Sequence, residues 1–257
     1  MLFTRDGLVG ALMMVVCLGF IGYIAYERLP ELLRAERTED PLPVYPLPLE
    51  GAQLKGDPSA RVAVIVYSDF ICAACARLAL LTMPTLEERY VKTGQALVAL
   101  RHFPRGTYRP LGYRAAEAAA CAGEQGRFWP MHDAIFQARA DGREYGRSDV
   151  QQLEADLRDF SARIGLDSSR FEECLRGRQS YSVFADAGSG AALGISGTPT
   201  ILVGVVDSDR RVRVLRHFRG RPEDQVLFAA IDNALETAGG GMTRRYGRST
   251  STVRRTQ

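Results

Sequence analysis

Two cysteines separated by two residues are the part of this sequence best suited to chemistry: Cys72 and Cys75 enclose Ala73 and Ala74. A thiol attacks a disulfide as its thiolate, and an ordinary cysteine, with a pKa of about 8.5, holds little thiolate at neutral pH. The unpaired N–H groups and the positive dipole end of a helix N-terminus stabilise that anion. We therefore expect thiol–disulfide exchange, with Cys72 as the exposed attacking sulfur and Cys75, one helical turn later, as the buried resolving sulfur.

Other uses of the same two sulfurs are open to a sequence of this kind. A structural zinc site needs a second Cys/His pair, but the remaining candidates are isolated in the chain: Cys121, Cys174, His102, His132 and His217. Two thiolates alone could bind copper(I), and two buried cysteines could be inert. We expect no metal and no organic cofactor, because a strand–CxxC–helix context is the one that redox chemistry requires.

The elements around the cysteines predict that context. Residues 61–67 (RVAVIVY) form a continuous apolar, β-branched run, typical of a strand buried on both faces. Residues 76–93 have helical spacing, with a kink or break expected at Pro84. Residues 96–103 predict a second strand, parallel to the first in a βαβ unit.

The second half of the chain completes a mixed sheet covered by helices. Residues 112–187 carry several helical patterns. Residues 200–206 and 211–218 predict an antiparallel strand pair, and Pro222 is expected just inside a last helix that ends before Gly239. The fold class is therefore α/β.

Gly197-Thr198-Pro199-Thr200 immediately precedes the third expected strand. A proline at the start of a strand cannot donate a hydrogen bond to the neighbouring strand. Taken alone, Pro199 is most simply interpreted as an ordinary trans proline in a loop. With the CxxC upstream, we expect a cis Thr198–Pro199 bond whose backbone groups face the cysteines. A client chain could then form hydrogen bonds there like an added strand.

The strand–SDFxCxxC–helix pattern, the helical insertion and the GTPT loop together resemble the DsbA-like branch of the thioredoxin superfamily, from about residue 51 to residue 237. The resemblance implies a thioredoxin-like fold with an inserted helical subdomain and a redox-active dithiol or disulfide at Cys72 and Cys75. It also implies substrate binding at Thr198 and Pro199, and action on cysteine-containing proteins exported from the bacterial cytoplasm.

The sequence departs from that family at two places. Many members carry a buried acid six positions before the first active cysteine, where this chain has Val66; Asp69 should lie elsewhere. The dipeptide Ala73-Ala74 replaces the common Pro-x and leaves only backbone N–H groups to hold the anion. We therefore expect the pKa of Cys72 to be lowered less than in the strongest oxidants.

The other cysteines and the histidines carry weaker signals. Cys121 and Cys174 lie in two helical patterns of the insertion, either as free buried thiols or, in an oxidising compartment, as a structural disulfide of the kind that some relatives carry. Cys17 is interpreted as an apolar filler. The three histidines, at positions 102, 132 and 217, are interpreted as structural or surface residues.

Residues 8–26 form a run of nineteen residues without a charge. A helix of this length spans roughly 28 Å, near the hydrocarbon thickness of a bilayer, so we expect an uncleaved transmembrane anchor. A cleaved signal peptide is the alternative, although no small-x-small site follows the run. Arg5 precedes it while Arg28, Arg34 and Arg37 follow it, so charge alone leaves the orientation open.

The whole chain then divides into five segments: 1–7, a short N-terminal segment; 8–26, the anchor; 27–50, a Pro-rich spacer; 51–238, the DsbA-like domain with its insertion at about 110–190; and 239–257, a disordered basic tail. With 46% hydrophobic and 25% charged residues, the composition excludes wholesale disorder and a polytopic membrane protein. The net charge of +3 does not favour a nucleic-acid partner.

The combined expectation is a single-pass thiol:disulfide oxidoreductase of the bacterial inner membrane, with its catalytic domain in the periplasm. Disulfide formation is the first choice of reaction, and reduction or isomerisation is the next. A redox partner, which the sequence does not identify, must reset the dithiol. A non-enzymatic copper-binding protein is the alternative of a different class.

Overall fold

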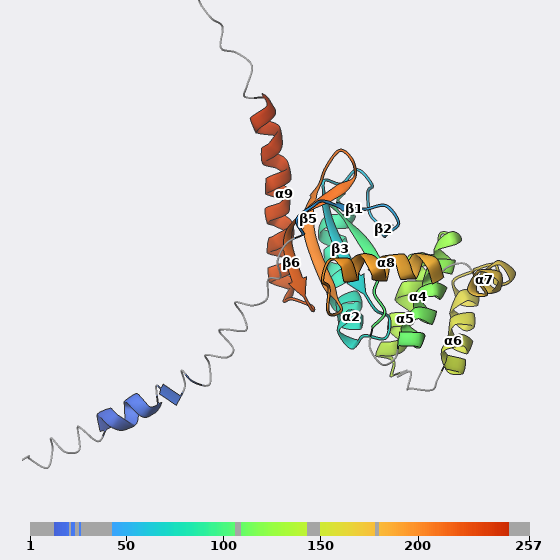
Figure 1. The fold of residues 1–257 in the computed structure, drawn as a ribbon, viewed down its shortest axis with the longest axis horizontal. Coiled ribbons are helices and arrows are strands. Elements are labelled where there is room, and N and C mark those ends of the chain that lie inside the picture. Colours follow the sequence, from blue (N-terminus) through green and yellow to red (C-terminus); the bar gives the residue numbers. More distant parts are fainter. Residues whose placement is uncertain are drawn as a thin grey trace, which may run out of the picture. The chain divides into compact units, whose positions relative to one another are not determined.

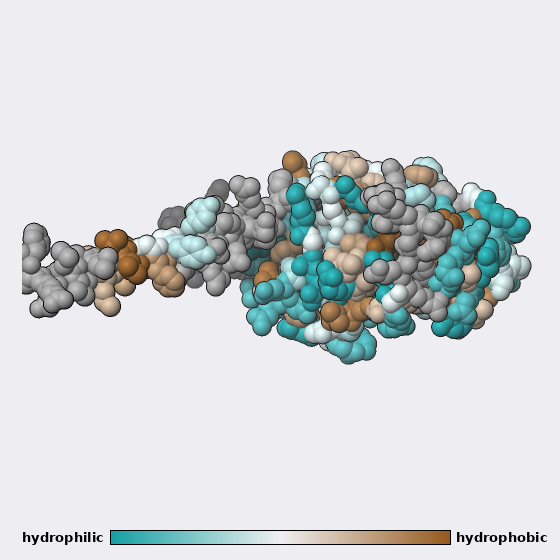
Figure 2. Space-filling view, turned by 90° about the horizontal axis from the view of Figure 1, so that it is seen from below, coloured by the Kyte–Doolittle hydropathy of each residue, from teal (hydrophilic) through white to brown (hydrophobic). Residues whose placement is uncertain are grey.

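The computed structural model describes residues 13–20, 22–23, 26, 43–105, 109–142, 150–177 and 180–246. The chain divides into two compact units, Met1–Asp40 and Pro41–Gln257. In the first unit, residues 13–20 are helical, and their apolar side chains are exposed (Figure 2). Within the described ranges, no helix is long and apolar enough to cross a membrane. The expected segment 1–7, part of the expected anchor, spacer residues 27–42 and tail residues 247–257 lie outside the described residues.

A six-stranded mixed sheet forms the centre of the second unit, in the order β1-β6-β5-β3-β4-β2 (Figure 1). Strands β3 and β4 are parallel, and every other neighbouring pair is antiparallel. This confirms the expected βαβ unit and the antiparallel pair, with strand ends within one residue of those predicted. The strands are β1 Leu47–Pro48, β2 Gln53–Lys55, β3 Val62–Ser68, β4 Ala96–His102, β5 Thr200–Val206 and β6 Arg211–Arg219.

The end of the expected Pro-rich spacer, residues 27–50, belongs to the sheet, so the expected end of the spacer at residue 50 is wrong. Leu47 pairs with Val212, and Pro48 pairs with Arg211. An edge strand tolerates proline because one side of its ladder is left unpaired. Leu47 and Leu49 are buried against the sheet. Burial of these leucines holds the segment against the sheet, although its prolines cannot donate hydrogen bonds to a neighbouring strand.

The strand before the cysteines is buried on both faces, as its sequence predicts. All seven residues of β3 are buried, and alternate residues contribute to two different cores. Val62, Val64 and Val66 join the core that contains residues of α9 (Asp224–Tyr246). Because both faces are packed, the end of β3 is a rigid platform for the loop that carries Cys72.

The helical run after the cysteines is irregular, as Pro84 predicts. It consists of α2 Ala73–Arg77, the π-helical segment η1 Leu78–Thr82, α3 Met83–Leu86 and the π-helical segment η2 Glu87–Val91. Pro84 stands in the first turn of α3. A proline has no N–H for the helical ladder, and a wider π turn before it accommodates that loss without ending the helix.

In the described part of the chain between β4 and β5, five helices form the insertion (Figure 1). They share a core that also includes Phe70, Cys75 and Leu100. They are α4 Arg109–Glu124, α5 Phe128–Ala140, α6 Val150–Arg163, α7 Ser168–Leu175 and α8 Ser180–Ala192. Helix α8 returns to the sheet at Gly190, where a Cβ atom would lie 2.7 Å from the ring of Phe103. This close approach brings the chain back to the loop that precedes β5.

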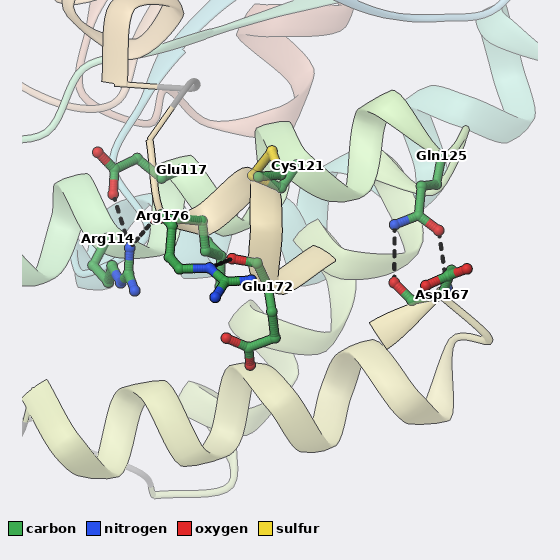
Figure 3. Close-up of a disulfide and its surroundings, with 9 residues drawn as sticks. Arg114, Glu117, Cys121, Gln125, Asp167, Glu172 and Arg176 are labelled. Carbon is green, nitrogen blue, oxygen red and sulfur yellow. Dashed lines mark hydrogen bonds and ion pairs between the residues drawn. A yellow bond between two sulfur atoms is a disulfide. The ribbon is translucent and has the colours of Figure 1, made fainter. Parts of the chain in front are cut away.

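A disulfide joins α4 to α7. Cys121 and Cys174 are bonded, with a Cα–Cα distance of 5.8 Å and a sequence separation of 53. The sequence left open whether these two cysteines are free thiols or a disulfide, and the structure has the disulfide. On one side of the bridge Gln125 and Asp167 exchange two hydrogen bonds, of 2.9 and 3.3 Å (Figure 3). Arg114 donates to the Leu175 carbonyl at 2.8 Å.

The last helix differs from the expectation at both ends. Helix α9 begins at Asp224, so Pro222 lies before it, and it continues through Gly239–Gly241 to Tyr246. Each glycine costs a helix about 1 kcal/mol relative to alanine, but unlike proline it keeps its N–H donor. A helix already stabilised by packing of Leu227 and Ile231 in the sheet core therefore continues across the glycines.

Candidate active site

The two cysteines lie where β3 ends and α2 begins. Cys72 is the N-cap residue of α2, with φ −82° and ψ 121°, and its carbonyl accepts a hydrogen bond from the Ala76 N–H at 3.1 Å. The Cys72 side chain is therefore at the helix end where backbone N–H groups lack helical acceptors. Cys75, one turn inside, is only 1% exposed, whereas Cys72 is half-buried. Both thiols are free. The more exposed Cys72 and the buried Cys75 agree with the exposure that the CxxC spacing predicts.

The electrostatics of the pair separate the two thiols. The pKa of Cys72 is lowered to about 5, chiefly by a hydrogen bond from the Cys75 thiol, although burial opposes the shift. The Thr198 side chain and the backbone N–H groups of residues 74 and 75 lower this pKa further. Burial raises the pKa of Cys75 well above its usual range, and Cys72 adds to that rise. The expectation that backbone N–H groups alone hold the Cys72 anion is therefore incomplete, because the Cys75 thiol contributes most.

The loop before β5 faces the attacking sulfur. The Thr198–Pro199 peptide bond is cis, and the Cys72 thiol donates to the Thr198 carbonyl at 3.3 Å. Strand β5 pairs with β3, and this pairing places Thr200 opposite Tyr67. Tyr67 is near the end of β3, where the loop that carries Cys72 begins. The register of the sheet therefore brings together two motifs that are 126 positions apart in the chain.

Asp69 is a buried carboxyl beside the dithiol, only 3% exposed. Its Oδ1 accepts from the Ile71 N–H at 3.1 Å and its Oδ2 from the Arg105 N–H at 2.9 Å. Burial raises the pKa of Asp69 to about 6. Val66 and Cys75 line a small cavity, and Asp69 is not among the residues that line it.

All three histidines are buried, so the alternative of a surface role is wrong for each. His132, on α5, lines the same cavity as Cys75 and packs against His102 through the shared ring of Phe70. No spacing in the sequence connects His132 with the cysteines. A usable signal was its place on the apolar face of its helix, four residues from both Phe128 and Phe136.

A groove opens beside the start of α2. It has a volume of about 310 Å³, and mostly apolar side chains of α2, η1 and α5 line it. Leu81 is 60% exposed at this groove, and Arg77 and Arg139 add positive charge to it. Among the residues that the structure describes, no cluster of three or more His, Cys, Asp or Glu side chains could hold a metal ion.

The rate of Cys72 alkylation should report this electrostatic arrangement. In the reduced protein we expect the rate to rise about tenfold per pH unit up to a midpoint near pH 5 and to level off above it, because only the thiolate reacts. Cys75→Ala removes the largest stabilising contact and should move the midpoint to higher pH. A wild-type midpoint well below 5, or an unmoved midpoint in the variant, would contradict this assignment. Thiolate absorbance at each pH measures the same midpoint independently.

Comparison with known proteins places the chain in a family. A family model described as Thioredoxin matches residues 50–214. The structure of alpha-DsbA1 from Wolbachia pipientis is similar, with a TM-score of 0.64, 25% identity, and coverage of 76% of this chain and 96% of that one. BdbD from Bacillus subtilis has a TM-score of 0.58 at 17% identity, covering 77% of this chain and all of its own, which shows a shared fold.

Curated relatives include Na(+)/H(+) antiporters. NhaA 1 of Salinispora arenicola is 30% identical over 193 residues, which is 75% of this chain but 26% of that protein. NhaA of Herminiimonas arsenicoxydans is 30% identical over 205 residues, 30% of its own length. The chain thus spans less than a third of the length of these two relatives. The family match and the fold agree with each other: the chain belongs to the thioredoxin family, and its fold is that of the DsbA-like thiol-disulfide oxidoreductases.

Proposed function

We propose that this oxidoreductase forms or exchanges disulfides in exported proteins, with Cys72 and Cys75 as its redox-active pair. The observation that carries the proposal is the asymmetry of the two sulfurs. Cys72 is half-buried at a helix N-terminus with a pKa of about 5, and Cys75 lies buried behind it with a raised pKa. A pair of this kind has one sulfur for the client and one for resolution.

Disulfide donation is the direction that we favour. A client thiolate attacks the Cys72 sulfur of the oxidised pair, the bond between the two cysteines breaks, and Cys75 leaves with the electron pair and takes up a proton. A second client thiolate then attacks the client sulfur of the mixed disulfide and releases Cys72 as a thiolate. The client loses two electrons and the enzyme gains them. A thiolate with a low pKa is a good leaving group and stabilises the reduced enzyme.

Thr198 and Pro199 are the proposed contact for the client backbone. The Thr198 carbonyl lies 3.3 Å from the Cys72 sulfur, so an N–H of a client segment crossing Cys72 would meet an acceptor close to the reacting atom. The groove beside Ala73 offers apolar surface to neighbouring client side chains. Exported proteins with cysteines are the expected substrates.

We place the enzyme on the bacterial inner membrane with its catalytic domain in the periplasm. The uncharged run at 8–26 supports an anchor, and a cleaved secreted form is the alternative. The Cys121–Cys174 bridge supports an oxidising compartment. A redox partner in the membrane or the periplasm must reoxidise the dithiol, because each turnover leaves two electrons on it.

Two measurements test the proposal. The purified full chain should catalyse oxidative refolding of a reduced, cysteine-containing protein and should also reduce insulin. Stoichiometric copper binding without either activity would replace it with a metal-binding function. In intact cells, a membrane-impermeant alkylating reagent should reach Cys72 once the pair is reduced; a dithiol that is protected from the reagent and reduced at rest would indicate a cytoplasmic reductase.

A further inference from the structure

A small cavity behind Cys75 connects the resolving sulfur to a histidine. Ser68, Cys75 and His132 line it with polar groups, and Val66 and Ala79 are among the apolar lining residues. Trp129 also lines it, but its Nε1 donates to the Leu54 carbonyl at 2.8 Å. About 10 Å³ of it is available to the centre of a water molecule, which is room for about one water. Cys75 is buried, and Cys72 is not among the residues that line the cavity.

His132 is also joined to solvent, through its neighbour on α5. Its Nδ1 lies 2.8 Å from Oδ1 of Asp133, and the Asp133 side chain is 62% exposed. Asp133 lines an open cleft of about 600 Å³ between α5 and the helical run after the cysteines, together with Glu87. A proton on Nδ1 that is donated to Asp133 leaves Nε2 as the acceptor of the ring. The pair thus lies between the buried cavity and the open cleft.

Several charged or titratable groups surround the His132 ring, from every element that packs near it: Lys55 on β2, Glu87 on η2, His102 on β4, Cys75 on α2 and Asp133 on α5. Burial lowers the pKa of His132 from its usual 6.5, while the hydrogen bond to Asp133 opposes that shift. The imidazole is therefore neutral at pH 7 and can accept a proton.

Cys75 needs such an acceptor when it resolves a mixed disulfide. Its thiol is buried, and the side chain six positions before Cys72 is Val66, which cannot take a proton. Once a client is bonded to Cys72, that sulfur no longer carries a negative charge. One cause of the raised pKa of Cys75 then disappears, and the proton becomes easier to remove.

We propose that His132, oriented by Asp133, accepts the Cys75 proton through one water in this cavity and exchanges it with the solvent of the open cleft. In the resolving step the proton passes from Cys75 to Nε2, and the Cys75 thiolate attacks the Cys72 sulfur. The client sulfur leaves with the electron pair of the broken bond. When the enzyme donates a disulfide, the protonated ring returns the proton to the departing Cys75. This inference rests on the proposed exchange function.

The test separates the attack of Cys72 from the resolution by Cys75. Full-length wild type, His132→Gln, Asp133→Asn and Asp141→Asn are reduced, mixed with a disulfide-bonded peptide and quenched with acid between pH 5 and 9. Asp141→Asn removes an acid at the end of the same helix, outside the residues that line the cavity, and serves as the control. The mixed disulfide and the released peptide are quantified by mass.

We expect His132→Gln to slow the release of the peptide roughly 100-fold at pH 7, the usual scale of a general base, with unchanged formation of the mixed disulfide. Asp133→Asn should slow release less and should move the acidic limb of its pH profile to lower pH, because the carboxylate that raises the pKa of His132 is lost. Asp141→Asn should match wild type.

Release with the wild-type rate and pH profile in His132→Gln would overturn the relay while leaving the exchange function intact. Failure of the wild-type protein to form any mixed disulfide would instead overturn the exchange function. If His132→Gln does not fold, Asp133→Asn decides the matter: a pH profile identical to that of wild type would overturn the relay.

Discussion

Replacing Cys72 by alanine should reduce both insulin reduction and oxidative refolding by about 1,000-fold or more, because it removes the only sulfur of the pair that a client can reach. The fold should survive, since the Cys72 side chain is half-buried and lies outside the sheet. Cys75→Ala should behave differently. Its Cys72 thiolate can still attack a client disulfide, but no second sulfur is available to release the product, so a mixed disulfide should accumulate.

Non-reducing gels and mass spectrometry would distinguish the two variants. Cys17→Ala is the matched control, because Cys17 is a free cysteine in the other unit of the chain and should leave both activities unchanged. Two outcomes would contradict the assigned roles. One is activity that persists in Cys72→Ala, and the other is the absence of a client trapped on Cys72 in Cys75→Ala.

The bridge between α4 and α7 carries the second large effect. Removing a cross-link that spans 53 residues in Cys121→Ala/Cys174→Ala should lower the free energy of unfolding by about 4 kcal/mol, because the unfolded chain regains the conformations that the cross-link excluded. Denaturant unfolding of the oxidised proteins measures this change. The double variant is preferable to added reductant, which would also reduce the Cys72–Cys75 pair.

Gln125→Ala provides the control for the same region. It removes the two exposed hydrogen bonds to Asp167 and leaves the bridge in place, so it should cost no more than about 1 kcal/mol for each bond. Below its unfolding midpoint the bridge-free variant should still exchange disulfides, because Cys72 and Cys75 lie at the start of α2, outside the two bridged helices. A loss of stability in the double variant no larger than that in Gln125→Ala would show that the bridge does not stabilise the folded protein.

Local patterns in the sequence were sufficient for the centre of the domain. The apolar run before the cysteines predicted β3, and the CxxC spacing predicted one accessible and one buried sulfur. The strand pair β5 and β6 followed from two strand-like runs separated by a short turn at residues 207–210. Each of these depends on residues close together in the chain, where side-chain size, β-branching and helix-end geometry act directly on the local backbone.

What the sequence left undetermined depends on which elements meet. Leu47 is a strand residue only because β6 offers an edge, and Asp69 is a buried carboxyl only because the Arg105 N–H reaches it. His132 is adjacent to Cys75 only because α5 packs beside α2. Pairing and burial between distant segments are properties of the packed chain, and a one-dimensional pattern does not specify them. The dithiol could thus be predicted from the sequence, whereas its surroundings, which set the pKa of each sulfur, were decided by the tertiary structure.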